Sequence, residues 1–497
     1  MVNESVMVGR KDDKETIMNM LLSHRDASHN AIGVVAILGM GGLGKTTLAQ
    51  LVYNDKEVQQ HFDLKAWACV SEDFDIMRVT KSLLESVTST TSDSNDHDVL
   101  RVELKKISRD KRFLFVLDDL WNDNYNDWSE LVSPFIDGKP GSMVIITTRQ
   151  EKVAEVAHTF PIHKLELLSN EDCWTLLSKH ALGSDEFHQS TNTTLEEIGK
   201  KIARKCGGLP IAAKTLGGLL RSKVDITEWT SILNSNIWNL RNDNILPALH
   251  LSYQYLPSHL KRCFAYCSIF PKDYPLDRKQ LVLLWMAEGF LDCSHGGKTM
   301  EELGDDCFAE LLSRSLIQQL SNDARGEKFV MHDLVNDLAI FVSAKSCCRL
   351  ECGDILENVR HFSYNQEYYD IFMKFEKLYN LKSLRSFLST SSRMYYSNCL
   401  SFKVVDDLIP SQKRLRVLSL SRYTNITELP DSIGNLVQLR YLDISFTKIK
   451  YLPDTTCNLY NLQTLNLSDC WRLTELPVHI GNLVKLRHLD ITGTNIS

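Results

Sequence analysis

A glycine-rich segment between a buried strand and a helix constrains the fold of this chain more than any other feature. Residues 39 to 46 read Gly-Met-Gly-Gly-Leu-Gly-Lys-Thr, which matches the phosphate-binding pattern G-x-x-x-x-G-K-[ST]. The apolar run Ile32 to Leu38 precedes this segment, and a helical pattern from Thr47 to Tyr53 follows it. Strand, loop and helix in this order predict a parallel α/β domain whose loop binds phosphate.

Each kind of residue in this loop has a separate expected task. The glycines let backbone N–H groups close around a β-phosphate, Lys45 reaches the terminal phosphates, and the Thr46 hydroxyl ligates Mg²⁺. The candidate residues for binding ADP or ATP are Gly39, Gly41, Gly42, Leu43, Gly44, Lys45, Thr46 and Thr47. The alternative, a glycine-rich turn without a ligand, is disfavoured because the flanking strand and helix are both present.

Charged residues follow two further apolar runs. The run Phe113 to Leu117 leads into Asp118, the candidate Mg²⁺ residue, because Mg²⁺ on phosphates needs an acidic ligand at such a strand end. Asp119 is the candidate catalytic residue, which would orient or deprotonate an attacking water; the alternative is a solvated loop acid. The run Met143 to Ile146 leads into Arg149, which could sense a γ-phosphate, although an arginine taken alone would more often lie on the surface.

An internal period marks the C-terminal part of the chain. Segments of the type Leu-x-x-Leu begin 24, 23 and 24 residues apart, at Leu415, Leu439, Leu462 and Leu486. This spacing is typical of the leucine-rich repeat, which stacks its apolar positions into one core and exposes a concave strand face to partners. The tyrosine- and serine-rich stretch from Tyr364 to Asn398, just before the repeats, is expected to be rich in turns.

Bulk properties exclude several classes of protein. A formal charge of −7 argues against a chain that coats nucleic acid through a general basic field, so no nucleic-acid partner is expected. No apolar stretch is long enough to span a bilayer and no secretory signal is visible, which together favour a cytoplasmic location. The 13 cysteines lack disulfide-like or zinc-like spacing and are expected to be buried thiols in a reducing compartment.

Eight motifs follow one another along the chain: Val8-Gly9-Arg10, the phosphate loop, Phe62 to Val70, the acidic strand ending in Trp121, Thr147-Thr148-Arg149, Cys206 to Ala212, Cys263 to Pro271 and Met331-His332-Asp333. This order resembles the plant NB-ARC leucine-rich-repeat immune receptors, often called disease-resistance proteins. The resemblance implies a P-loop NTPase domain at residues 1–160, a helical domain at 161–240, a winged-helix domain at 241–350 and leucine-rich repeats at 351–497. Helical patterns at 171–180, 195–206 and 211–220 agree with the second of these domains.

The resemblance also implies roles for residues that the phosphate motif does not cover. Val8, Gly9 and Arg10 would lie against the adenine, and Pro210 would close the adenine pocket. Arg149 would be the sensor arginine. His332 would reach the β-phosphate of ADP, and Asp333 would orient this histidine or cap the helix that follows. Without the resemblance, a histidine at such a helix start is more often a core or cap residue.

By the same resemblance, the chain would be a switch that ADP holds off and ATP turns on, with at most a weak regulatory ATPase activity. Its repeats would sense a pathogen effector or a guarded host protein, and activated chains could associate with one another. The alternatives are a P-loop ATPase acting on a separate substrate, or a repeat scaffold with a structural nucleotide. Trp121 is similar to the tryptophan of the coiled-coil subclass, whose N-terminal domain and further repeats we expect to be missing from this sequence.

Overall fold

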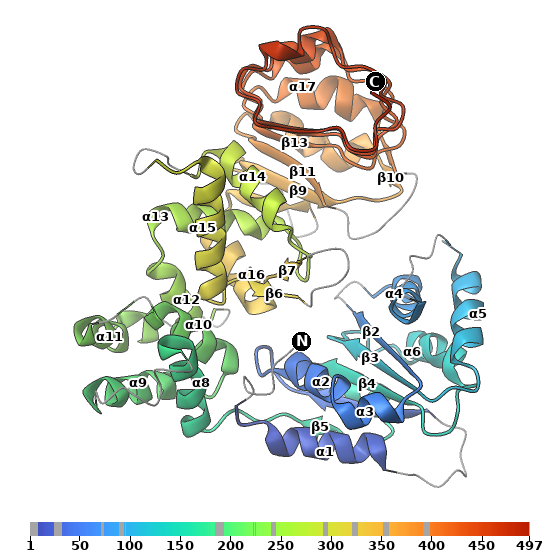
Figure 1. The fold of residues 1–497 in the computed structure, drawn as a ribbon, viewed down its shortest axis with the longest axis vertical. Coiled ribbons are helices and arrows are strands. Elements are labelled where there is room, and N and C mark those ends of the chain that lie inside the picture. Colours follow the sequence, from blue (N-terminus) through green and yellow to red (C-terminus); the bar gives the residue numbers. More distant parts are fainter. Residues whose placement is uncertain are drawn as a thin grey trace. The chain divides into compact units, whose positions relative to one another are not determined.

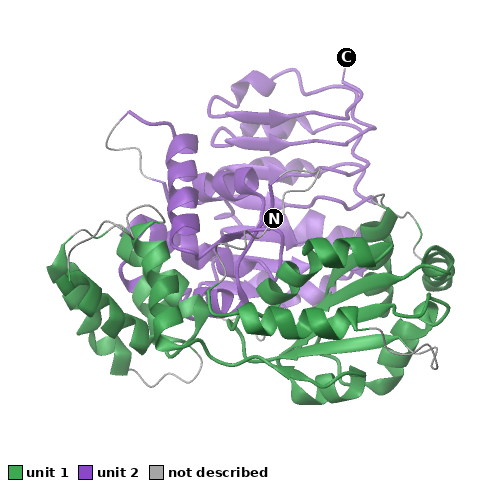
Figure 2. Cartoon of the chain, turned by 60° about the horizontal axis from the view of Figure 1, so that its bottom comes forward, with its two compact units in different colours: residues 1–252 green, residues 253–497 purple. Residues whose placement is uncertain are grey.

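The computed structural model divides the chain into two compact units, residues 1–252 and residues 253–497 (Figure 2). The structure describes residues 8–23, 32–70, 74–88, 94, 96–183, 193–221, 223, 225–239, 245–291, 297–320, 327–350, 357–390 and 398–496. None of the helices formed by these residues combines the length and the apolar character that crossing a membrane requires.

A parallel five-stranded sheet forms the core of the first unit, in the order β2-β3-β4-β1-β5 (Figure 1). Its strands are β1 (Gly33–Leu38), β2 (Leu64–Cys69), β3 (Phe113–Asp118), β4 (Met143–Thr148) and β5 (His163–Lys164). The apolar runs of the sequence form β1 to β4, so the predicted parallel α/β fold is confirmed. Their carboxyl ends share one edge of the sheet, which brings the segment after β1 close to the ends of β3 and β4.

Helices cover both faces of this sheet. In β1, Val35 and Ile37 pack against α1 (Lys11–Leu22), α2 (Lys45–Tyr53) and α3 (Lys56–His61). Val34 and Ala36 point to the other face, which is covered by α4 (Ile76–Thr88), α5 (His97–Ser108), α6 (Tyr125–Val132) and α7 (Glu151–Ala157). Period-two alternation thus divides the core into two layers.

A helical region completes the first unit. Its helices are α8 (Asn170–Leu182), α9 (Thr193–Lys205), α10 (Pro210–Arg221), α11 (Ile226–Leu233) and α12 (Pro247–Gln254), the last of which crosses the boundary between the units. The three helices expected here from amphipathic patterns are confirmed as α8, α9 and α10. Helix α10 is buried along most of its length, which makes it the central helix of this region.

The second unit opens with helices and a short hairpin. The helices are α13 (Ser258–Tyr266), α14 (Arg278–Glu288), α15 (Met300–Ser313) and α16 (Asp333–Val342), and the antiparallel pair is β6 (Gln318–Gln319) and β7 (Phe329–Val330). The aromatic and cysteine-rich segment of α13 lies inside, because Cys263, Phe264 and Tyr266 are buried. These elements form the helical core and the wing of a winged-helix arrangement.

A parallel sheet runs through the repeats in the order β16-β15-β14-β13-β11-β9-β8. The four predicted repeats supply β13 (Val417–Ser419), β14 (Tyr441–Asp443), β15 (Thr464–Asn466) and β16 (His488–Asp490). Three earlier strands extend the sheet: β8 (Cys347–Arg349), β9 (His361–Asn365) and β11 (Ser386–Thr390). Flanking pieces are β10 (Tyr369–Asp370), β12 (Cys399–Leu400) and α17 (Ile409–Ser411).

The expectation of a turn-rich stretch between Tyr364 and Asn398 was therefore wrong in part. This stretch contains the end of β9 and the whole of β11, and the side chains of Tyr364 and Ser386 are fully buried. Tyrosine and serine suggested turns, but Tyr364 and Ser386 lie in strands and form hydrogen bonds inside the solenoid. The Tyr423 hydroxyl, for example, donates to the Tyr364 hydroxyl at 3.0 Å. Residues 391–397 of this stretch lie outside the described residues.

A buried carboxylate joins the winged-helix elements to the repeat sheet. Glu288, the last residue of α14, accepts a hydrogen bond of 2.6 Å from the Ser386 hydroxyl of β11. His361 Nδ1 lies 3.5 Å from the same carboxylate oxygen, and Arg416 donates to the Glu288 carbonyl at 2.6 Å. Burial would raise the pKa of Glu288, but His361, Ser386 and Arg416 outweigh it and hold that pKa below its usual range.

Candidate nucleotide site

The phosphate loop ends in a backbone conformation that favours glycine. Gly44 has φ of +93° and caps α2, which begins at Lys45, two residues before the helix expected from the sequence pattern. The pattern missed this first turn because Lys45 and Thr46 are polar and carry no apolar periodicity. As a result, both side chains project from the first turn of a helix whose N-terminus carries a partial positive charge.

Lys45 is buried within the loop that precedes it. Its Nζ atom donates to the carbonyl oxygens of Gly39 at 2.8 Å and Met40 at 3.1 Å. Burial, and after it the charge of Arg149, lower the pKa of Lys45 to about 8, although the nearby carboxylates of Asp119 and Asp118 act in the opposite direction. A lysine held in this way gains an anionic partner at low cost, because its ammonium group is already desolvated and positioned.

Thr46 and Asp118 meet at the edge of the sheet. The Thr46 hydroxyl donates to Asp118 Oδ1 at 3.0 Å, and the Thr147 hydroxyl donates to the same oxygen at 2.5 Å. Thr147, from the end of β4, also accepts a hydrogen bond of 2.8 Å from the Asp119 amide. Sequence reasoning included Thr147 in a motif but gave it no role, although it fixes both acids.

Asp119 is engaged by two neighbours. Trp121 Nε1 donates to Asp119 Oδ2 at 3.0 Å, and Arg149 Nε lies 3.5 Å from Asp119 Oδ1. The Arg149 guanidinium also lies 5.1 Å from the centre of a Trp121 ring. The expected catalytic acid and the expected sensor arginine are thus paired, and Trp121, which the sequence offered only as a mark of a subclass, contacts both.

The segment before α1 and the start of α10 approach the loop from other sides. Arg10 is buried, donates to the Leu43 carbonyl at 3.2 Å, and follows the half-buried Val8 and the exposed Gly9. Pro210 is the first residue of α10, and the next amide, that of Ile211, donates to the Gly42 carbonyl at 3.4 Å. The structure therefore brings the candidate residues at 8–10, 39–47, 118–119, 149 and 210 together within the first unit.

His332 belongs to the second unit, where it performs a structural task. Its Nδ1 atom accepts a hydrogen bond of 3.2 Å from the Leu334 amide and so caps α16. The expectation that Asp333 could be the cap was wrong: Asp333 is the first residue inside the helix and is buried. The backbone of His332 has the extended conformation typical of an N-cap residue, so Asp333 lies one position too late to cap the helix.

The residues around the loop fit a nucleotide with Mg²⁺. The phosphate loop has free space at Gly44, where an added Cβ would meet nothing within 4 Å. The Nε atom of Arg10 is buried and has no hydrogen-bond partner among the described residues, which is costly unless a ligand supplies an acceptor. Hydroxyl and carboxylate oxygens from Thr46 and Asp118 are the hard ligands that Mg²⁺ prefers.

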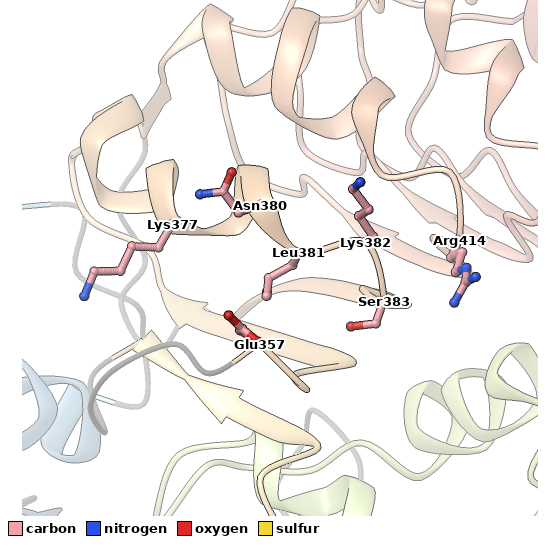
Figure 3. Close-up of a pocket in the computed structure, with 7 residues that line it drawn as sticks. All are labelled: Glu357, Lys377, Asn380, Leu381, Lys382, Ser383 and Arg414. Carbon is pink, nitrogen blue, oxygen red and sulfur yellow. The ribbon is translucent and has the colours of Figure 1, made fainter.

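A pocket in the repeat region offers a contrast. It is lined by Glu357, Lys377, Asn380, Leu381, Lys382, Ser383 and Arg414. Figure 3 shows that its cationic side chains extend in different directions: Lys377 to the left, Lys382 upward, and Arg414 downward at the right of the view. Cations that do not converge give no defined site for an anion, so the phosphate loop is the better candidate.

Three family models match the chain in the order that the structure shows. They are the NB-ARC domain over residues 10–186, the disease resistance protein winged helix domain over 269–339, and the leucine-rich repeat region over 398–497. Among solved structures, a signal transduction ATPase with numerous domains from Pyrococcus horikoshii matches 69% of this chain and 44% of that one. Its sequence identity is 20% and its TM-score 0.41.

Curated relatives match along most of the chain. The putative disease resistance RPP13-like protein 1 of Arabidopsis thaliana is 46% identical over 93% of this chain and 44% of its own length. The putative disease resistance protein RGA1 of Solanum bulbocastanum is 39% identical over 89% of this chain and 42% of its own length. The chain thus spans less than half the length of these relatives. With its nucleotide-binding, winged-helix and repeat regions in this order, it belongs to the NB-ARC leucine-rich-repeat family of plant disease resistance proteins.

Proposed function

We propose that this chain is a nucleotide-dependent switch that ADP holds off and ATP turns on. The observation that carries the proposal is the meeting of Thr46 and Asp118 beside Lys45 at the N-terminus of α2. Lys45 offers a positioned cation to the phosphates, and the two oxygens offer ligands to Mg²⁺. Bound Mg²⁺ would supply charge that offsets the phosphates and polarises the terminal one.

The surroundings of Asp119 support a switch over a turnover enzyme. Its carboxylate accepts from Trp121 and faces Arg149, so both of its oxygens already have a partner and fewer acceptor sites remain to hold an attacking water. Hydrolysis should therefore be slow and should serve to reset the switch. A P-loop ATPase acting on a separate substrate is the second candidate. Such an enzyme needs a carboxylate that is positioned to activate the attacking water.

Partners and location belong to the same proposal. We assign the sensing of a pathogen effector or a guarded host protein to the repeat sheet, because a solenoid exposes one residue set per repeat along its strand face. Self-association would follow activation. A cytoplasmic location is supported by the thiols, since the cysteines described in the structure, Cys173 and Cys206 among them, form no disulfide. Most of these thiols are buried, whereas Cys69 is exposed.

The nucleotide that copurifies with the chain and the rate of its release test this proposal. Stoichiometric ADP with slow release is expected for the switch, whereas rapid multiple turnover of ATP would favour the enzyme.

Lys45→Arg should abolish tight nucleotide binding, because a planar guanidinium does not replace a compact ammonium in this close-fitting loop. Lys56→Arg, at an exposed position of α3, is the matched control and should bind as the parent does. Equal affinity for ADP in the two variants would show that the phosphate loop is not the nucleotide-binding site.

A further inference from the structure

Asp119, Trp121 and Arg149 form a closed group at the carboxyl edge of the sheet. The Trp121 indole donates its N–H to one carboxylate oxygen of Asp119 at 3.0 Å, and Arg149 Nε lies 3.5 Å from the other. The guanidinium lies 5.1 Å from a Trp121 ring centre, which closes the third side. Each member therefore contacts the other two.

Local structure explains why these residues meet. Asp119 has φ of +55°, an uncommon conformation for a residue other than glycine, and its amide is fixed by the Thr147 hydroxyl. This sharp turn after β3 brings Trp121 back toward the end of β4, which pairs with β3 and leads into Arg149. Strained backbone of this kind persists only where the surroundings hold it, and it often marks functional positions.

The group lies beside the phosphate-binding lysine. The charges of Arg149 and Asp119 both act on Lys45, in opposite directions, so the pair is electrostatically coupled to the site where phosphates would bind. The Asp119 and Arg149 side chains are about one-fifth exposed, at 22% and 20%. A guanidinium that is only partly buried can exchange one anionic partner for another without a large desolvation cost.

We propose that Trp121 is a positioning residue that holds the Arg149 guanidinium against Asp119 and thereby sets the preference of the site for a nucleoside diphosphate over a triphosphate. This inference rests on the proposed nucleotide switch. Arg149 must leave Asp119 and the Trp121 ring to meet a γ-phosphate, whereas a diphosphate lets it stay. Whatever strengthens the resting contact lowers the affinity for ATP and leaves that for ADP unchanged.

Three substitutions separate the contacts of the group. Trp121→Phe keeps an aromatic face for the guanidinium and loses the N–H to Asp119, whereas Trp121→Leu loses both. Asp119→Asn removes the charge that holds Arg149. The ratio of the ADP to the ATP dissociation constant should rise in each, by about threefold to tenfold for Trp121→Leu, as expected for the loss of a cation–π contact, and by less for Trp121→Phe. Trp128→Phe, in α6, is the matched control and should leave the ratio unchanged.

Competition against a fluorescent ADP analogue, with Mg²⁺ present, gives both constants for each variant. If Trp121 served only in folding, its substitution would weaken the binding of ADP and of ATP to the same extent and leave the ratio of the two dissociation constants unchanged. An unchanged ratio in Trp121→Leu and Asp119→Asn, in a chain that binds both nucleotides, would overturn this inference alone. A parent chain that binds neither nucleotide would overturn the proposed function and this inference with it. Tryptophan emission provides a second readout: it should change more with ATP than with ADP, and this difference should vanish in Trp121→Phe.

Discussion

The Thr147 hydroxyl donates to Asp118 Oδ1 at 2.5 Å across 29 residues of sequence, and this contact holds the candidate Mg²⁺ ligand at the end of its strand. Thr147→Val keeps the shape of the side chain and leaves a buried carboxylate and the Asp119 amide without this partner. We expect a loss of about 1–3 kcal/mol in the free energy of unfolding, measured by denaturant titration. The dependence of ADP affinity on Mg²⁺ should also weaken. Thr147→Ser keeps the hydroxyl and should behave like the parent; equal losses in both variants would contradict this role.

The lowered pKa of Lys45 predicts proton uptake on nucleotide binding. This pKa is about 8, and phosphates favour the ammonium form, so it should rise in the complex. Binding then takes up a proton, and the affinity for ADP should fall as the pH rises through 8. Calorimetry at pH 8.5 in two buffers with different ionisation enthalpies measures the uptake. Lys45→Met should abolish the buffer dependence along with most of the affinity; a parent chain without proton uptake would contradict the lowered pKa.

The same pKa shift affects stability in the opposite direction. The pKa of Lys45 in the folded chain lies below its ordinary value of 10.5, so the unfolded chain binds more protons between pH 8 and that value. The contribution of Lys45 to the free energy of unfolding should therefore rise with pH across this window. Comparing the parent with Lys45→Met by denaturant titration at pH 7.5 and 10 isolates this contribution.

Glu288 should stabilise the second unit far more than Glu301 does. The Glu288 side chain is fully buried and bonded to Ser386, whereas Glu301, 29% exposed, pairs with Arg487 and His488 at the surface. Glu288→Gln should cost about 3–5 kcal/mol, because it breaks a buried charge pair. Glu301→Gln should cost less than about 1 kcal/mol. Calorimetric unfolding of the full chain compares the two, and equal costs would show that the buried network is not stabilising.

The pH dependence of the Glu288 contribution follows from the direction of its pKa shift. The pKa of the carboxyl is held below its ordinary value of 4.5 in the folded chain, so the unfolded chain binds a proton first as the pH falls. The stabilisation is therefore complete above pH 4.5 and is lost as the pH falls through the folded-state pKa. Glu288→Gln should remove this dependence.

His332 allows its capping role to be separated from a proposed contact with ADP. His332→Asn retains a good N-cap acceptor for the Leu334 amide and removes the imidazole, whereas His332→Ala removes both. If His332 also bonds the β-phosphate, both variants should release ADP about ten to a hundred times faster, in line with the loss of a hydrogen bond to a charged group. His332→Ala should additionally lose about 1 kcal/mol of stability. If His332→Asn released ADP at the same rate as the parent chain, His332 would serve only as the N-cap of α16.

The parts of the site that are local in sequence were the most predictable. The loop at 39–46 and the acid at Asp118 were found because each motif carries its own strand or helix. The contacts of Thr147 and Trp121 were not, because they depend on how the ends of β3 and β4 meet in space. In the repeats, regular spacing predicted the four later strands. Strands β9 and β11 were not predicted, because the segments between them and β13 are longer and less regular.

The register of the repeat sheet has a consequence for how such a surface can change over generations. Val417, Tyr441, Thr464 and His488 stand side by side, one from each repeat. Gain or loss of a whole repeat would preserve this alignment, whereas a shift of a single residue would turn the buried leucines outward. Misaligned recombination between the DNA segments that encode the repeats can therefore lengthen or shorten the strand face of the solenoid in one step and still yield a folded protein.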